Sequence, residues 1–134
     1  MTACPCGSGV ELAACCGPFL TGAALPETAE ALMRSRYSAH VLGTVDYLKE
    51  TLWPAYQKRF DPRATAAFAN DTAWIGLTII ETEAGGAADR RGIVLFEARF
   101  LAGDRVEVHR ERSLFRKKAG RWYYLEALPE TPDA

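Results

Sequence analysis

The chain has 134 residues, 49% of them hydrophobic and 25% charged, and its formal net charge is −1. This length and hydrophobic content fit one ordinary globular domain with a small N-terminal addition. The longest apolar stretches are too short to span a membrane and no secretion signal precedes them, so we expect a cytoplasmic protein without a membrane partner. A net charge so close to zero gives no general preference for an acidic or a basic partner.

All four cysteines of the chain lie within its first sixteen residues, at Cys4, Cys6, Cys15 and Cys16. Residues 7–9 (Gly-Ser-Gly) supply the tight reversal that brings the second pair back to the first. Two close thiolate pairs across a short turn are what a tetrahedral Zn²⁺ site requires. Because protein sulfur takes all four positions, none is left for water, and the sequence predicts one structural rather than catalytic zinc ion.

Two other interpretations of the cysteines are weaker. Disulfides would have to run between the two pairs, because the partners within each pair are poorly spaced for bridging, and the rest of the chain has no cysteine that would suggest an oxidising compartment. Residues 12–15 resemble a lipidation site, but no basic residue precedes them, and Pro5 and Glu11 interrupt the apolar run that such a signal needs.

The first half of the chain predicts three helices. Thr28 is a favourable N-cap for a helix over 29–42, which Gly43 ends, and apolar residues recur at helical spacing between them. A second, short helix is expected over 45–52, before the Trp-Pro pair at 53–54. Asp61 caps a third helix that has proline at its first position.

The second half predicts four strands. The period of the apolar residues changes to two, and turn residues separate the runs 74–83, 92–101, 106–116 and 122–128. Helices followed by antiparallel strands indicate an α+β fold, with the helices packed on one face of a curved sheet.

Three segments carry a resemblance to a known family. The Cys-Pro-Cys-Gly-Ser-Gly run with the later Cys-Cys pair resembles the SEC-C zinc motif, in which the last ligand is commonly His rather than Cys16. With the runs 28–40 and 120–124, the chain resembles the bacterial YchJ-type family. The resemblance implies a SEC-C zinc knuckle over residues 1–20 and an NTF2-like cone over 21–129. The residues themselves predict a linker over 17–26 that leads off the knuckle, and a flexible polar tail over 130–134.

The third strand holds the best candidates for chemistry in a cone pocket. His109 lies between two carboxylates, Glu107 and Glu111, on the face that also carries Ser113 and Phe115. A histidine beside a carboxylate suits a general base or a ligand-binding group, so His109 and Glu111 are weak catalytic candidates. The opposite face is also mixed, and the sequence leaves open which one looks inward.

If the His109 face lines the cone, its polar groups must be paired. We then expect a network of His109, Glu111 and Ser113 with one of Tyr37, Trp74 or Tyr124. Arg34 or Arg36 of the first helix is expected to pair with a sheet carboxylate such as Glu97 or Glu111, or else to hold an anionic ligand at the mouth of the cone.

A basic segment lies at residues 105–121. A solvated strand face explains it in the ordinary way, and a surface for an anionic partner is the functional alternative. The residues of that surface are Arg110, Arg112, Arg116, Lys117 and Lys118.

The main functional expectation is a zinc-binding accessory protein whose knuckle docks a protein partner. The SEC-C motif is named for the C-terminal zinc tail of the SecA translocase, and by analogy with that tail the partner is associated with protein export or the ribosome. The basic segment adds weight to a partner that is rich in nucleic acid. The alternative is a small-molecule binder or enzyme that uses a pocket around His109 and Glu111, and a third is a homodimer formed through the sheet. Sequence motifs for dinucleotide, P-loop or serine-hydrolase chemistry are absent.

Overall fold

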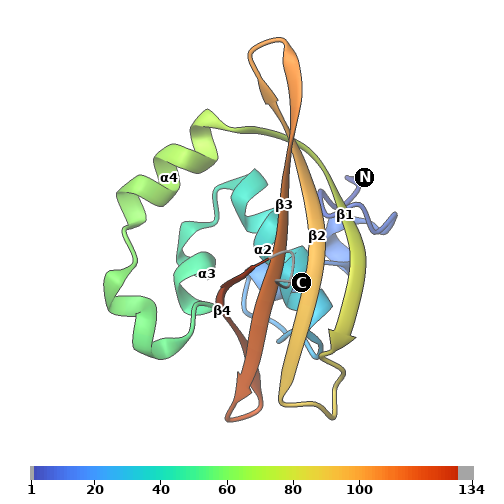
Figure 1. The fold of residues 1–134 in the computed structure, drawn as a ribbon, viewed down its shortest axis with the longest axis vertical. Helices are drawn as coiled ribbons and strands as arrows, with labels where there is room; N and C mark the ends of the chain where they lie inside the picture. Colours follow the sequence, from blue (N-terminus) through green and yellow to red (C-terminus); the bar gives the residue numbers. More distant parts are fainter. Residues whose placement is uncertain (1, 130–134) are drawn as a thin grey trace.

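The computed structural model of the protein describes residues 2–129, so the tail expected over 130–134 lies outside the described residues. Helices occupy the first half and strands the second, as predicted (Figure 1). In chain order the elements are η1 (Leu12–Ala14), α1 (Gly17–Leu20), α2 (Ala29–Leu42), α3 (Val45–Glu50), η2 (Pro54–Arg59), α4 (Pro62–Asp71), β1 (Ala73–Ala84), β2 (Arg91–Ala102), β3 (Arg105–Lys118) and β4 (Arg121–Leu128). Within this part of the chain, no helix is long and apolar enough to cross a membrane.

The four strands form an antiparallel meander in the order β1-β2-β3-β4. Two register shifts in β1 and one in β3–β4 increase the local twist, so the sheet curves around the helices (Figure 1). The face that carries Val94, Phe96 and Ala98 of β2 is buried, as the two-residue period predicts. The predicted α+β fold, with helices packed on one face of a curved antiparallel sheet, is confirmed.

Helix α2 is the central helix against the sheet. The Thr28 side chain accepts a hydrogen bond from the Ala31 amide at 3.0 Å, and Gly43 ends the helix in the left-handed conformation at φ 74°. Its buried residues Leu32, Met33 and Tyr37 face the core formed with the inner face of β2. Burial of these apolar side chains supplies the main stabilisation of the helix on the sheet.

The far edge of the sheet is closed by the chain between α3 and η2. Leu52 forms a parallel bridge with Tyr124 of β4, and the Trp53 amide donates to the Tyr124 carbonyl at 2.9 Å. The Trp122 side chain donates to the Glu27 carbonyl at 3.0 Å and is almost fully buried. These contacts hold β4 against the helical layer and turn the sheet into a cone.

Two segments differ from the sequence expectation. The linker expected over 17–26 begins with helix α1, because Pro18 suits the first turn and Phe19 and Leu20 pack against the core. Residues 54–59 form the 3-10 helix η2, which the sequence analysis did not predict. A short segment that starts with proline gives little periodic signal, so apolar spacing alone does not reveal it.

The cysteine knuckle packs against the body, a question that the sequence left open. Cys4, Cys6 and Cys16 belong to the same buried cluster as the residues of α2 and the sheet. A side chain at Gly7 would lie 3.2 Å from the carbonyl oxygen of Leu77 in β1, so the turn of the knuckle lies closely against that strand. The knuckle and the cone therefore share one core.

Candidate functional site

The four cysteine sulfurs form one compact cluster. All four Sγ atoms lie within 4.8 Å of one another, with Cys6 and Cys15 separated by 3.6 Å and Cys15 and Cys16 by 4.0 Å. A tetrahedron with Zn–S bonds of about 2.3 Å has sulfur–sulfur edges of about 3.8 Å. No disulfide joins these cysteines. The spacing and the soft donor set therefore fit one tetrahedrally bound metal ion, which these four residues would hold.

Local hydrogen bonds shape the turn that carries this cluster. The Cys4 amide donates to the Val10 carbonyl at 2.9 Å, and an antiparallel bridge joins Ala3 to Glu11. The Ser8 hydroxyl accepts a hydrogen bond from the Val10 amide and lies 3.2 Å from the Cys15 sulfur. The two cysteine pairs are thus held face to face by the short loop between them.

Helix α2 reaches the cluster from the other side. Arg34 donates to the Cys6 carbonyl at 2.9 Å and lies 4.0 Å from its sulfur, while the Ser38 hydroxyl is 3.5 Å from the Cys4 sulfur. A hydrogen bond from Cys16 is the largest influence on Cys6, and with smaller ones from Ser8 and Cys4 it outweighs burial and lowers the pKa of Cys6 to about 4. A metal ion binds the deprotonated form of cysteine, so Cys6, with the cationic Arg34 beside it, is in the form that a metal ligand needs.

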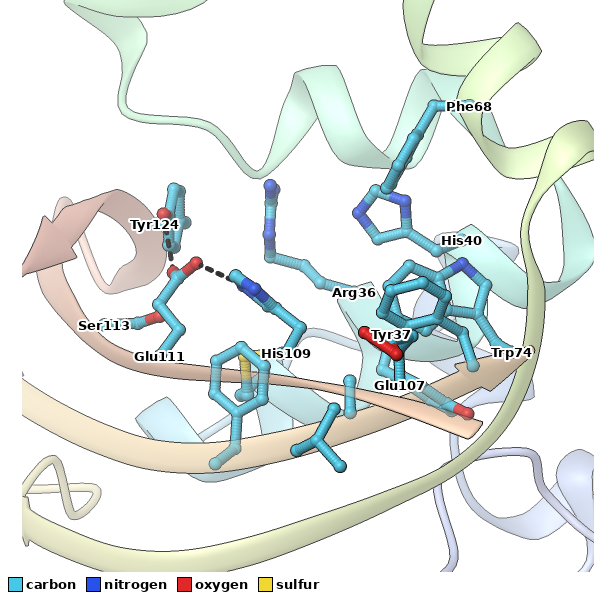
Figure 2. A pocket seen from close by; sticks show the side chains of 15 residues that line it. Arg36, Tyr37, His40, Phe68, Trp74, Glu107, His109, Glu111, Ser113 and Tyr124 are labelled. Carbon is cyan, nitrogen blue, oxygen red and sulfur yellow. Dashed lines mark hydrogen bonds and ion pairs between the residues drawn. The ribbon is translucent and has the colours of Figure 1, made fainter. Parts of the chain in front are cut away.

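A second site lies inside the cone. A cavity of about 410 Å³, here called the cone pocket, opens between the helices and the inner face of the sheet (Figure 2). Its lining residues are Met33, Arg36, Tyr37, His40, Phe68, Trp74, Phe96, Ala98, Phe100, Glu107, Val108, His109, Glu111, Ser113 and Tyr124. The face of β3 that carries His109 therefore looks inward, which settles the question of the two faces.

Glu111 organises the polar end of the cone pocket. Its carboxylate accepts hydrogen bonds from Ser113 at 2.5 Å, Tyr124 at 2.9 Å and His109 Nε2 at 3.0 Å (Figure 2). Burial alone would raise the pKa of Glu111, but these three hydrogen bonds outweigh it and lower the pKa below its ordinary value. Glu111 is therefore a carboxylate with every partner in place, and it fixes the orientation of the His109 ring.

Arg36 brings a positive charge into the same pocket. It donates to the Leu48 carbonyl at 2.9 Å and the Thr51 hydroxyl at 2.6 Å, and its guanidinium lies 4.8 Å from the centre of the Tyr124 ring. Burial lowers the pKa of Arg36 to about 10, so the group remains charged at about pH 7. Among the residues that the structure describes, no carboxylate lies within 4.0 Å of it.

The expected pairing of Arg34 or Arg36 with a sheet carboxylate is therefore wrong. Arg34 points towards the knuckle and pairs with Glu30, one turn earlier in α2, at 2.9 Å. Arg36 instead reaches Leu48, whose carbonyl lies in the last turn of α3 and has no partner within that helix. The end of a neighbouring helix replaces the carboxylate that the sequence suggested.

The opposite end of the cone pocket is aromatic. Trp74 lies at its centre, and its ring centroid is 5.9 Å from that of Phe68 and 6.0 Å from that of Tyr37 (Figure 2). The ring of Phe100 lies 5.3 Å from it. Two buried nitrogens of this end, Trp74 Nε1 and His40 Nδ1, have no hydrogen-bond partner in the structure. Such groups are uncommon in folded proteins, because each one loses its hydrogen bonds to water without a replacement.

All six predicted pocket residues line this cavity. They are Tyr37, Trp74, His109, Glu111, Ser113 and Tyr124. The predicted polar network forms with Tyr124, whereas Tyr37 and Trp74 contribute rings.

The sequence pattern did not reveal His40 and Phe68 as pocket residues, and it indicated another main role for Arg36. A signal for two of these residues was present, because Met33, Arg36, Tyr37 and His40 are spaced three or four residues apart and so share one stripe of a helix.

The five basic residues of β3 that were predicted to form a surface for an anionic partner have different neighbours. Arg110 pairs with Glu97 at 2.9 Å and Arg112 with Glu83 at 3.0 Å, on the outer face of the sheet. Lys117 donates to the Ala87 carbonyl. The other two, Arg116 and Lys118, lie beside the ring of Trp53.

Comparison with known proteins agrees with both parts of the molecule. The model of the YchJ middle NTF2-like domain matches residues 28–127, and that of the SEC-C motif matches residues 2–18. The chain belongs to the YchJ family. A UPF0225 protein from Actinobacillus succinogenes is 42% identical over 134 residues, which cover 99% of this chain and 86% of the relative.

Two solved structures share the whole fold. The solution structure of a SEC-C motif containing protein from Rhodopseudomonas palustris has a TM-score of 0.86 and 40% identity, over 96% of this chain and 98% of that one. The crystal structure of a SEC-C motif containing protein from Psychrobacter arcticus has a TM-score of 0.82 and 31% identity, over 98% and 83% of the two chains. The SEC-C motif and NTF2-like domain predicted from the sequence are thus confirmed.

The environment of His40 predicts how stability depends on pH. Burial, helped by the charge of Arg36, lowers the pKa of His40 from 6.5 to about 4. Protonation then favours the unfolded chain, so stability is full above about pH 6.5 and falls as the pH drops towards about 4, by roughly 3 kcal/mol. Urea unfolding at a series of pH values should show that His40→Phe loses much less stability over this range than the wild-type protein.

Met33 provides the control, because it lines the same pocket and carries no titratable group. Met33→Leu should therefore keep the wild-type pH slope, since this exchange nearly conserves side-chain volume. Equal slopes for the wild-type protein and His40→Phe would show that His40 is not held neutral by its surroundings.

Proposed function

We propose that this protein binds a small, mainly apolar molecule in the cone pocket, and that a zinc ion in the cysteine knuckle stabilises the domain that forms the pocket. The observation that carries the proposal is the cavity of about 410 Å³ with two buried nitrogens, Trp74 Nε1 and His40 Nδ1, that lack partners. A pocket of this size and mixed character is typical of small-molecule sites. The pocket thus favours the alternative that the sequence analysis placed second.

The lining describes the ligand. The rings around Trp74 suit a flat apolar body, because aromatic groups pack well at their edges and faces. An oxygen atom of the ligand would accept from Trp74 Nε1, and Arg36 offers a positive charge to an acidic group. The ligand class that fits is an aromatic or alicyclic molecule with one oxygen-rich or acidic end.

The same lining favours binding over catalysis. The hydrogen bond between His109 and Glu111 fixes the orientation of the His109 ring, and this arrangement suits a general base. However, the Ser113 hydroxyl donates to Glu111 rather than to His109, so it is not activated as a nucleophile. His109 and Glu111 thus orient a ligand, in the role that the sequence analysis gave them as pocket residues.

Zinc is the metal that we propose for the knuckle. A set of four thiolates at tetrahedral spacing suits this ion, and it leaves no position open for a reaction at the metal. Three of the four cysteines lie in the shared core, which supports a structural role. Free thiols that bind metal also fit the reducing cytoplasm, where we place the protein.

The zinc assignment predicts one metal ion per chain. Native mass spectrometry of protein purified without added metal should show one bound zinc, and Cys15→Ser should lose it and unfold several degrees earlier. Ser8→Ala is the matched control, because Ser8 touches the Cys15 sulfur without being a ligand, so this variant should keep the zinc. A metal-free chain about 4 Da lighter than the reduced mass would mean two disulfides and would contradict the assignment.

The pocket predicts binding of an aromatic sulfonate. The dye 8-anilino-1-naphthalenesulfonate should bind the native protein at one saturable site, seen as increased fluorescence. Ala98 lies on the buried face of β2 and lines the cavity, so Ala98→Phe should fill it and weaken binding at least tenfold. Arg36→Met should weaken binding by about tenfold, the equivalent of 1.4 kcal/mol, because the sulfonate loses its cation.

The control for this experiment lies on the other face of the sheet. Leu101 of β2 is 44% exposed and does not line the pocket, so Leu101→Phe should leave dye binding unchanged. Near-ultraviolet circular dichroism would verify that each variant is folded. Unchanged affinity in folded Ala98→Phe would place the dye elsewhere and contradict the pocket proposal.

Docking of a protein partner by the knuckle is a second candidate function. The observation that favours it is the exposed loop over residues 7–11, whose apolar Val10 is 44% exposed while the cysteines face the body. An exposed loop that the cysteines hold at both ends suits a contact with another protein. A photocrosslinker placed at Val10 in cells should give a discrete product that the same group at exposed Thr21 does not give, and identical products from both positions would contradict docking.

A further inference from the structure

Two segments without acidic residues lie side by side at the edge of the sheet. Residues 51–60 and 112–125 contain no Asp or Glu. The bridge between Leu52 and Tyr124 joins them, and the Tyr124 amide also donates to the Thr51 carbonyl at 2.8 Å. In Figure 1 the chain that follows α3 passes beside β4. The fold thus joins segments that are distant in the sequence and share one sign of charge.

Aromatic rings and cations alternate where these segments meet. The Trp53 ring has the Arg116 guanidinium 5.6 Å and the Lys118 ammonium 5.5 Å from its centre. The Tyr123 ring lies 5.9 Å from that of Trp53, and the Arg121 guanidinium lies 5.6 Å from the centre of the Tyr123 ring. We call these five residues the Trp53 patch.

The cations of the Trp53 patch lack acidic partners. Within residues 2–129, no carboxylate lies within 4.0 Å of Arg116, Lys118 or Arg121, in contrast to Arg112, which pairs with Glu83. Side chains that only stack on rings keep most of their charge available to a ligand. The whole chain has a net charge of −1, so this positive surface is a local feature and not a general excess.

The Trp53 patch is separate from the cone pocket. Arg116 pairs with Tyr123 in the register of β3 and β4, so both lie on the face of the sheet opposite to Tyr124, which lines the pocket. Arg116 and Lys118 are exposed, whereas Trp53 and Tyr123 are half-buried. A ligand of the patch therefore leaves the pocket free.

We propose that the Trp53 patch binds single-stranded RNA. The cations that lie over the rings of Trp53 and Tyr123 match the phosphates of a backbone. When these cations turn to the phosphates, the two rings offer platforms on which unpaired bases stack. A base pair in a duplex hides its face, so double-stranded nucleic acid would use only the charges. An acidic peptide likewise matches the charges but leaves the two rings without a role.

The test is fluorescence anisotropy with labelled oligouridine of about 12 nucleotides and the full-length protein. Three cations in contact with phosphates predict that the logarithm of the binding constant falls with the logarithm of salt concentration with a slope of about −2. Trp53→Leu should weaken binding by about tenfold through lost stacking, while Trp53→Phe retains a ring and should recover most of the affinity.

Charge reversal separates the patch from the net charge of the protein. Arg116→Glu should weaken binding at least tenfold and make the salt slope shallower. Arg105→Glu gives a chain of the same net charge, but Arg105 is 76% exposed at the opposite end of β3, where Figure 1 shows the β2–β3 turn, so it should bind like wild type.

Three results would overturn the proposal. Failure of oligouridine to bind at low salt would remove it directly. Equal weakening by Arg116→Glu and Arg105→Glu would show that only net charge matters. Heparin or duplex RNA that competes as well as oligouridine, together with no effect of Trp53→Leu in a folded protein, would show an attraction for polyanions without base stacking.

Discussion

The packing of helix α2 between the cysteine knuckle and the curved sheet is the interaction on which the rest of the structure depends. Arg34 and Ser38 lie towards the knuckle, where they contact Cys6 and Cys4. Arg36 and His40 leave the same helix towards the cone pocket. Since successive residues of a helix are rotated by about 100°, residues 34–40, about two turns, are enough to face two sites at once. Anything that shifts this helix would affect the cysteine cluster and the pocket together.

The polar end of the cone pocket has a complete hydrogen-bond network, whereas its aromatic end contains two nitrogens without partners. Glu111 has three donors in place, and the network is rigid because each partner is held by a strand of the sheet. Trp74 Nε1 and His40 Nδ1, by contrast, are buried without partners. A fold that needed only a stable core would fill this space with apolar side chains, so the combination is typical of a site that is completed by a ligand.

Strand β3 shows how one strand can serve several environments. Its inward residues Glu111 and Ser113 build the pocket, while Arg110 and Arg112 on the outer face are neutralised by acids of β1 and β2. Only past the end of the pocket, at Arg116, do the cations meet rings instead of carboxylates. The cations of the strand are therefore paired with carboxylates along most of its length, and at one end they remain available to a ligand.

The sequence by itself determined the longer helices, the strands and the cysteine cluster. The Thr28 cap, the stop at Gly43 and the two-residue alternation of β2 are local signals, because caps, turns and strand period depend on residues close in the chain. The four cysteines were readable for the same reason, since their spacing lies within one short turn. The curved α+β fold followed from the order of these elements.

The tertiary structure alone decided which of these residues meet. Both faces of β3 are mixed, so only packing against α2 could place His109 inside, and the partner of Arg36 proved to be the end of α3 rather than a sheet carboxylate. Only the tertiary structure brings Trp53 and Arg116 together, because these residues are far apart in the chain. Long-range contacts of polar residues depend on sub-ångström geometry and on competition among many partners, and no local pattern in the sequence records the outcome.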